Sequence, residues 1–419
     1  MPEKIKSVFI NIGICFVSTT LFVLVMELVF PKILHKLPLS FYVSLGKDYK
    51  ILGQYHKKSV IPTDYVALVG DSHALGSGDW YLEAVKKHKL TQGAYHSAHI
   101  LFKETGRDIL SFGALGSGSL RGLVLKPVSY FKYLNSLRGF KLEPPEEILV
   151  YFFEGNDLSD NAYAIHKTFS AGYDMGRLYD PEYFKTFIEK ELLGTDPLYM
   201  GKVPFKNWLF SRFLVESVSD NVYNEVKRGI NKLKIFFSRL LETTQAQAEG
   251  VRVSLDFSNN VSETNSDIAL VDGKEFLFPH STQQPGLNLN EEQNKQAFYV
   301  FEQSLRYMAG YFNGAKITIV YIPSPVSVYN WISPKITILV PRGKLKFTPR
   351  EIYQRSDKIF KHIEAVSRKY NFALIDTRLP LRSAALKEPV HGPRDWYHPN
   401  RKGYEVIAGE ILKNTGFGK

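Results

Sequence analysis

The chain has 419 residues, of which 44% are hydrophobic and 23% charged, so most of it can bury a globular core. The formal net charge of +11 favours anionic partners such as lipid headgroups or acidic polysaccharide, whereas the lack of zinc-finger spacing and of long Lys/Arg blocks argues against nucleic acid. A single cysteine, Cys15, excludes an intrachain disulfide and a cysteine-ligated zinc site.

An uncharged segment, Val8–Met26, follows Lys4 and Lys6 near the N-terminus, and Glu27 interrupts it before the apolar run resumes. About 20 apolar residues span a bilayer, so this segment predicts a single transmembrane helix. No small-x-small cleavage site follows it, which favours an uncleaved anchor over a signal peptide. Positive charges lie on both sides of the segment, and the preceding pair predicts that the domain after it lies outside the cytoplasm, in the periplasm or at the cell surface.

Short apolar runs bounded by polar residues predict five buried strands: Tyr65–Gly70, Arg107–Phe112, Glu147–Phe153, Lys316–Ile322 and Phe372–Ile375. Helices are predicted between them: Gly78–Lys89, Ser119–Leu137 with a kink or break at Pro127, two helices opened by capping boxes at 290–293 and 348–351, and Arg401–Asn414. Apolar strands that alternate with helices predict an α/β domain with a doubly wound parallel sheet, in the three-layer α/β/α, flavodoxin-like arrangement.

Residues 158–289 interrupt this alternation. Pro181–Leu193 and 207–244 have helical patterns, the latter basic and amphipathic, whereas 245–289 is rich in Ser, Asn and Gln and predicts a loop. The segment is either a lid or membrane-facing surface, or a helical subdomain packed on the core. The predicted organisation is therefore an anchor and its flank (1–37), a first part of the α/β domain (38–157), an insertion (158–289) and a second part of the α/β domain (290–419).

Polar residues with catalytic potential follow the first two strands. Gly70-Asp71-Ser72-His73 places a serine on a tight strand-to-helix turn, with its hydroxyl at the carboxyl edge of the sheet. The second strand leads into a glycine-rich stretch, 111–118, whose backbone N–H groups can approach a ligand closely. Each stretch alone is equally typical of a simple turn.

Two further segments complete the set. Glu154-Gly155-Asn156-Asp157 follows the third strand, where an Asn side chain can donate a hydrogen bond to a developing oxyanion, although Asn-Asp is also a common helix cap. Asp395-Trp-Tyr-His398 precedes the last helix, and this spacing lets the carboxylate orient the imidazole and stabilise the imidazolium. Alone, His398 reads as a surface residue beside a helix start.

Together the four segments make the chain resemble the SGNH (GDSL-like) hydrolase superfamily, in a bacterial membrane-anchored form, over about 65–153 and 316–414. The resemblance implies a Ser72, Asp395 and His398 triad. It also implies an oxyanion hole built from the Ser72 N–H, the Gly116 N–H and the Asn156 side chain. It implies hydrolysis of carboxylic esters, acetyl esters among them, through an acyl-enzyme, with no cofactor and no metal.

The chain departs from the family pattern at two positions and leaves one alignment open. Gly155 and Asn156 are adjacent, whereas the family has a residue between them, and His73 stands where an apolar residue is common. His73 also resembles the DSH motif of alginate-acetylation proteins, in which the Asp/His pair lies upstream of the serine. In the alignment with the family, either Gly116 or Gly113 can be the glycine of the stretch after the second strand that supplies an N–H to the oxyanion hole.

Three functions remain open from the residues. Ester hydrolysis, with a lipid or acylated glycan as substrate, is the leading interpretation. Acyl transfer to a sugar hydroxyl of an envelope or exopolysaccharide uses the same residues. The third alternative is a non-catalytic module of polysaccharide assembly. A metal hydrolase is not indicated, because His96-Ser-Ala-His99 lacks a nearby acidic or third ligand.

Overall fold

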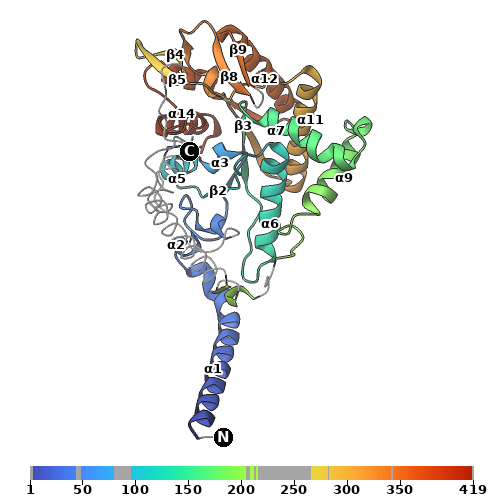
Figure 1. The fold of residues 1–419 in the computed structure, drawn as a ribbon, viewed down its shortest axis with the longest axis vertical. Helices are drawn as coiled ribbons and strands as arrows, with labels where there is room; N and C mark the ends of the chain where they lie inside the picture. Colours follow the sequence, from blue (N-terminus) through green and yellow to red (C-terminus); the bar gives the residue numbers. More distant parts are fainter. Residues whose placement is uncertain are drawn as a thin grey trace, which may run out of the picture. The chain divides into compact units, whose positions relative to one another are not determined.

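A computed structural model describes residues 3–43, 49–79, 96–203, 208–211, 214–215, 266–281, 283–340 and 343–417 (Figure 1). The chain forms two compact units. The smaller comprises residues 1–53, 137–140 and 203–258, and the larger comprises 54–136, 141–202 and 259–419. All four segments with catalytic potential belong to the larger unit.

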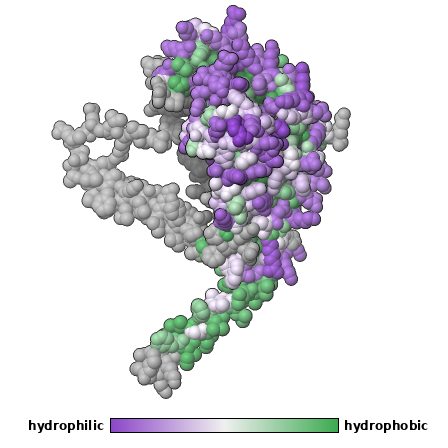
Figure 2. Space-filling model, turned by 90° about the vertical axis from the view of Figure 1, so that its right-hand side faces the viewer, coloured by the Kyte–Doolittle hydropathy of each residue, from purple (hydrophilic) through white to green (hydrophobic). Residues whose placement is uncertain are grey.

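A long apolar helix, α1 (Glu3–Ile33), opens the smaller unit and is followed by η1 (Leu34–Lys36), α2 (Leu39–Val43) and η2 (Lys50–Gly53). Its stretch Ser7–Ile33, 27 residues long, is apolar enough to cross a membrane. The surface of α1 is apolar along this stretch (Figure 2), and most of its large apolar side chains are exposed, whereas Phe30 is buried. The predicted N-terminal helix is therefore confirmed as an element that can span a bilayer by length and composition.

Glu27, the charge within this apolar helix, has a partner distant in the sequence. Its carboxylate accepts hydrogen bonds from the backbone N–H groups of Phe210, at 3.2 Å, and Ser211, at 2.6 Å. The rings of Phe22 and Phe30 pack edge to face on Phe210, with centroid distances of 5.9 and 5.4 Å. The carboxylate thus satisfies N–H groups at the start of a short helical segment, which offsets the cost of a charge among apolar side chains.

The larger unit is built on a five-stranded parallel sheet in the order β10-β6-β3-β1-β2. Each strand falls within or beside a predicted apolar run: β1 (Val66–Val69), β2 (Ile109–Ser111), β3 (Glu147–Phe153), β6 (Lys316–Ile322) and β10 (Ala373–Asp376). Every residue of β1, β2 and β3 is buried, as a parallel sheet covered by helices requires. The predicted α/β class and the central parallel sheet are confirmed.

The helices of this unit form two groups that pack among themselves. One group contains α5 (Ser97–Thr105), α13 (Arg378–Ala385) and α14 (Arg401–Thr415), and the other contains α6 (Lys126–Ser136), α7 (Asp157–Ala164) and α11 (Glu291–Tyr311). α5 and α14 lie to the left of β3 in Figure 1, and α6, α7 and α11 lie to its right. Both predicted capping boxes are present, at the starts of α11 and of α12 (Pro349–Lys369).

The helix predicted around Pro127 has no break. A π-helical segment, η4 (Leu120–Leu125), leads directly into α6, and Pro127 is the second residue of α6. The widened π turn lies just before the proline, where the ring and the missing N–H would otherwise disturb regular i→i−4 bonding.

The loop predicted over 245–289 is wrong for its second half. Ser266–Val271 (β4) and Lys274–Pro279 (β5) form an antiparallel hairpin. Its two turn residues, Asp272 and Gly273, have φ of 52° and 70°, the positive values that a two-residue hairpin turn needs. β4 also pairs with β7 (Asn330–Trp331), and a second hairpin joins β8 (Ile336–Val340) to β9 (Gly343–Phe347).

The helical half of the predicted insertion is present from residue 157 to 193. It comprises α7, η5 (Ile165–Phe169), α8 (Ser170–Gly172), η6 (Met175–Arg177), α9 (Pro181–Phe187) and the π-helical η7 (Ile188–Leu193). α7 and α9 pack against α11. The predicted helices 78–89 and 207–244, and the loop over 245–265, lie mostly or wholly outside the described residues.

Candidate active site

Ser72 stands at the carboxyl end of β1, on the first turn of a short helix, α3 (Ser72–Leu75). Gly70 makes this turn possible, because its φ is 142° and a Cβ there would lie 2.7 Å from the carbonyl oxygen of Tyr151 on β3. Asp71 caps the helix, accepting from the N–H of His73 at 2.8 Å. The Ser72 side chain is therefore held on an abrupt strand-to-helix turn, and it is 6% exposed.

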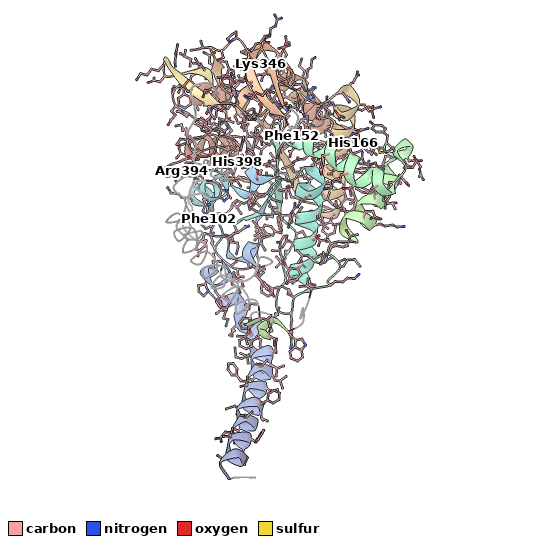
Figure 3. All side chains as sticks on the ribbon, viewed as in Figure 1. Phe102, Phe152, His166, Lys346, Arg394 and His398 are labelled. Carbon is pink, nitrogen blue, oxygen red and sulfur yellow. The ribbon has the colours of Figure 1, made fainter. Side chains whose placement is uncertain are left out.

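Three of the predicted site residues form a continuous chain of hydrogen bonds. The Ser72 Oγ lies 2.8 Å from His398 Nε2, and His398 Nδ1 lies 2.7 Å from Asp395 Oδ2. Figure 3 labels His398, which lies next to α3. The other carboxylate oxygen of Asp395 accepts from the backbone N–H groups of Tyr397, at 3.0 Å, and His398, at 3.2 Å.

This arrangement assigns a role to each ring nitrogen of His398. Asp395 can only accept when ionised, so Nδ1 carries the proton and Nε2 is free to accept from the Ser72 hydroxyl. Burial opposes ionisation of Asp395, but the hydrogen bond and charge of His398 and the two backbone N–H groups hold its pKa below the ordinary value. Chemically, the trio can remove the proton from a serine hydroxyl as it attacks.

Asp79 holds the segment that carries Asp395, a role that sequence reasoning missed. Its Oδ1 accepts from the backbone N–H of Asp395 at 2.6 Å and from that of Arg394 at 3.1 Å. Burial and the nearby charge of Asp395 raise the pKa of Asp79, against the two N–H groups that lower it. The preceding Gly78 is also in close contact, because a Cβ there would lie 2.7 Å from the carbonyl oxygen of Pro399. The loop after α3 is thus fastened to the His398 loop.

A second Asp–His pair lies behind the first. His73 Nδ1 is 3.1 Å from Asp71 Oδ2, and the same oxygen lies 3.5 Å from the Ser72 Oγ. The His73 ring packs on Phe153 and lies 5.0 Å from the His398 ring, centroid to centroid. Burial lowers the pKa of His73, so its ring stays neutral beside His398. His73 is the second residue of α3, at a helix start, and its buried ring also lies against the site.

Asn156 follows β3 as predicted, at the N-cap of α7, yet its side chain does not cap the helix. Its Oδ1 is buried, with no hydrogen-bond partner among the described residues. The next residue, Asp157, accepts from the Phe153 N–H at 2.9 Å. Asn156 makes no hydrogen bond to Ser72, Asp395 or His398 in the described part of the chain, so its amide is not committed to the triad.

Gly113 and Gly116, the two candidates for the oxyanion-hole glycine after the second strand, lie in different surroundings. Gly113 packs on the helix that carries the serine, since a Cβ there would lie 2.2 Å from the backbone nitrogen of Leu75. Gly116 has a φ of 55°, and a Cβ there would meet nothing within 4 Å. Gly113 is therefore the glycine in contact with α3, whereas Gly116 lies in open space.

Two acidic side chains beside the site have raised pKa values. Burial and the charge of Asp71 raise the pKa of Asp157 well above its ordinary value and that of Asp160 to about 6. No group of three or more His, Cys, Asp or Glu side chains suited to a metal occurs among the residues that the structure describes. His96 and His99 instead pack edge to face, at 4.7 Å between centroids, and His56 packs on both.

No family model, curated protein or solved structure matches the chain. The function is therefore argued from the geometry of the site.

Proposed function

We propose that the protein is a serine esterase of the SGNH type, which cleaves carboxylic esters through an acyl-enzyme. The observation that carries this proposal is the unbroken hydrogen-bond chain from the Ser72 Oγ through His398 to Asp395, at 2.8 and 2.7 Å. Serine is a weak nucleophile unless an adjacent base, itself oriented by a third group, takes its proton. Here the nucleophile, the base and the orienting carboxylate are each within hydrogen-bond reach.

In the first half-reaction, the Ser72 Oγ attacks the ester carbonyl carbon as His398 Nε2 takes the hydroxyl proton. The tetrahedral oxyanion is stabilised by N–H donors. The proposed donors are the Ser72 backbone, which as the first residue of α3 has no intrahelical acceptor, the Asn156 amide, and Gly116 or its rival Gly113. The C–O bond to the alcohol then breaks, and His398 gives its proton to the departing oxygen.

In the second half-reaction, a water attacks the acyl-enzyme while His398 takes one of its protons. The bond between the acyl carbon and the Ser72 Oγ breaks, and the proton returns to Ser72. The carboxylic acid leaves, and the triad is restored. If a sugar hydroxyl replaces the water, the same steps transfer the acyl group, so analysis of the products separates hydrolysis from acyl transfer.

The proposal extends to fold and location. The strand order β10-β6-β3-β1-β2 supports a three-layer, flavodoxin-like, doubly wound sheet. Ser72 then lies at the carboxyl end of β1, where such sheets reverse their strand order and bind ligands. We also propose that α1 anchors the protein in a membrane with the larger unit outside the cytoplasm, where lipids or acylated glycans are the accessible esters.

The test is covalent labelling of the detergent-solubilised full-length protein with a fluorophosphonate, together with hydrolysis of p-nitrophenyl acetate. Ser72→Ala should abolish labelling and lower turnover by about 10³-fold or more. Ser77→Ala is the matched control, because Ser77 is also buried and its Oγ has no hydrogen-bond partner among the described residues. Equal labelling of wild type and Ser72→Ala, or none of either, would favour a non-catalytic module.

A further inference from the structure

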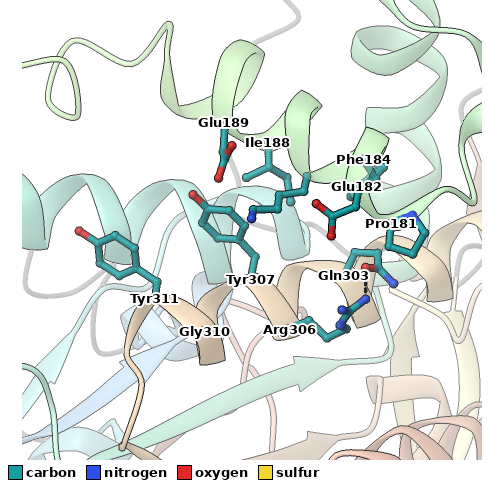
Figure 4. Close-up of a pocket in the computed structure, with 11 residues that line it drawn as sticks. Pro181, Glu182, Phe184, Ile188, Glu189, Gln303, Arg306, Tyr307, Gly310 and Tyr311 are labelled. Carbon is teal, nitrogen blue, oxygen red and sulfur yellow. Dashed lines mark hydrogen bonds between the residues drawn. The ribbon is translucent and has the colours of Figure 1, made fainter.

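A groove lies in the larger unit, between α9 with its continuation η7 on one side and α11 on the other (Figure 4). Its volume is about 390 Å³, within the range of small-molecule sites. None of the triad residues lines it. The lining residues are Pro181, Glu182, Phe184, Lys185, Ile188, Glu189, Gln303, Arg306, Tyr307, Gly310 and Tyr311.

The groove lies against a face of α11 that lacks a side chain at Gly310, near the end of the helix. The lining residues of α11 recur at intervals of three and four, so they share a face. Gly310 lies on this face between Tyr307 and Tyr311, and a Cβ there would meet nothing within 4 Å. The opposite wall contains the π-helical η7, which begins at Ile188, and π-helical turns occur frequently at functional sites.

The groove carries charged groups of both signs that are not paired with one another. Glu182 and Glu189 supply carboxylates, and Lys185 and Arg306 supply cations. In the described part of the chain, none of these four side chains forms an ion pair. Arg306 Nη1 instead donates to Gln303 Oε1 at 3.0 Å, which fixes both side chains at the groove wall (Figure 4).

This balance of charge selects among ligand classes. A phosphate, sulfate or uronate would face two carboxylates, and an organic cation would face a lysine and an arginine. A neutral molecule with many hydroxyl groups suits both, because each hydroxyl donates to a carboxylate or accepts from a cation. Tyr307 and Tyr311 add aromatic rings with a polar end. Burial raises the pKa of the Tyr307 hydroxyl, so it stays a neutral donor.

We propose that this groove binds a neutral oligosaccharide. Sugar rings stack on Tyr307 and Tyr311 across the gap at Gly310, and their hydroxyl groups bond to Gln303, Arg306 and the two carboxylates. The site is separate from the triad residues, and the proposal does not depend on the esterase activity. It predicts binding that persists when Ser72 is replaced.

The test is ligand-observed NMR titration of the detergent-solubilised full-length protein carrying Ser72→Ala. The probes are maltotriose, cellotriose, mannotriose and chitotriose, with trigalacturonate as the anionic comparison. At least one neutral trisaccharide should bind with a dissociation constant in the millimolar range or tighter. Trigalacturonate should bind about tenfold more weakly or not at all.

Gly310→Leu places a side chain in the groove from a position where a Cβ meets nothing within 4 Å, and it should weaken binding by about tenfold or more. Gly409→Leu is the matched control, because Gly409 also lies in a helix where a Cβ meets nothing within 4 Å. Tyr307→Ala should weaken binding by a similar factor and reports independently if Gly310→Leu misfolds. The proposal is overturned if no neutral trisaccharide binds, or if trigalacturonate binds as tightly as the neutral trisaccharides. It is also overturned if Gly310→Leu and Tyr307→Ala, both folded, bind like the wild type.

Discussion

Asp395→Asn is the sharpest perturbation of the proposed triad, because it keeps the shape of the side chain and removes its charge. The asparagine oxygen can still accept from the backbone N–H groups of Tyr397 and His398, so the loop should keep its conformation. The amide nitrogen, however, is a donor, and it would lie where the carboxylate now accepts from His398 Nδ1 at 2.7 Å. The imidazole would then carry its proton on Nε2 and could not accept from Ser72.

The expected loss follows from these contacts. A hydrogen bond to a charged group contributes about 1.5–3 kcal/mol, which corresponds to a loss of about 10- to 150-fold at 1.36 kcal/mol for each factor of ten. The reversed tautomer removes the base itself and adds to this loss. Triads in which the aspartate is replaced by asparagine lose about 10⁴-fold. We therefore expect kcat to fall about 10³- to 10⁴-fold in Asp395→Asn, with KM little changed.

The assay is steady-state hydrolysis of p-nitrophenyl acetate by the full-length protein, with the melting temperature measured in parallel. His398→Ala should be at least as damaging, and the double variant should be little worse than the worse single variant, because the two residues act as one unit. If the two losses multiply, the residues act independently and the triad assignment is refuted. A loss of less than about tenfold in Asp395→Asn would refute the tautomer argument.

Four further predictions follow from the same region. Asn156→Ala should lower kcat about 10²- to 10³-fold with a smaller effect on KM, and a defect confined to KM would indicate a binding role instead. Asp79→Ala removes the acceptor for the backbone N–H of Asp395 and should lower kcat about tenfold or more, which steady-state kinetics measures against an unchanged far-UV circular dichroism spectrum. Glu154→Gln should lower the free energy of unfolding by about 2–4 kcal/mol in urea titrations, because buried Glu154 accepts from the hydroxyls of Tyr321, Ser324 and Ser356 and from the Ser324 N–H; an unchanged midpoint would contradict this. The pKa of Asp160 is about 6 in the folded state against an ordinary 3.8, so the folded protein loses stability as the pH rises between these values. Asp160→Asn should therefore raise the melting temperature at pH 8 but not at pH 4. Equal shifts of the melting temperature at both pH values would contradict the raised pKa.

The parts of the fold that were predictable depend on local sequence. The five strands are short, mostly apolar runs, and β3 and β6 begin and end at the predicted residues. The helix starts at Asn290 and Thr348 were predictable because a capping box is a contact between residues three apart. The β4–β5 hairpin could also have been found. Its Asp272-Gly273 pair, between two strand-like runs, is a strong short-range hairpin signal, and the polar composition upstream obscured it.

The parts that were not predictable depend on contacts between distant segments. Asp395 and His398 are three residues apart, so their pairing follows from spacing, whereas Asp79 reaches the same loop across 316 positions. Nothing local distinguishes Asp79 from an ordinary helix cap. For the same reason, the partner of Glu27 at Phe210 and Ser211 could not be read from an apolar run interrupted by one charge. Such partners appear only when the topology brings the segments together.

Two polar side chains that follow β3, Glu154 and Asn156, differ in how many hydrogen bonds they make. Glu154 has hydrogen-bond donors at both carboxylate oxygens, supplied by side chains and backbone from two neighbouring segments. Two residues on, the Asn156 Oδ1 is buried without a partner among the described residues, as are His73 Nε2 and Asp160 Oδ2. Each such atom costs about 1–3 kcal/mol. His73 follows Ser72 in α3, Asn156 is the N-cap of α7, and Asp160 interacts with the charge of Asp71. The same strand end therefore holds a fully bonded carboxylate at Glu154 and a buried amide oxygen without a partner among the described residues at Asn156, which leaves the Asn156 side chain available for its proposed oxyanion role.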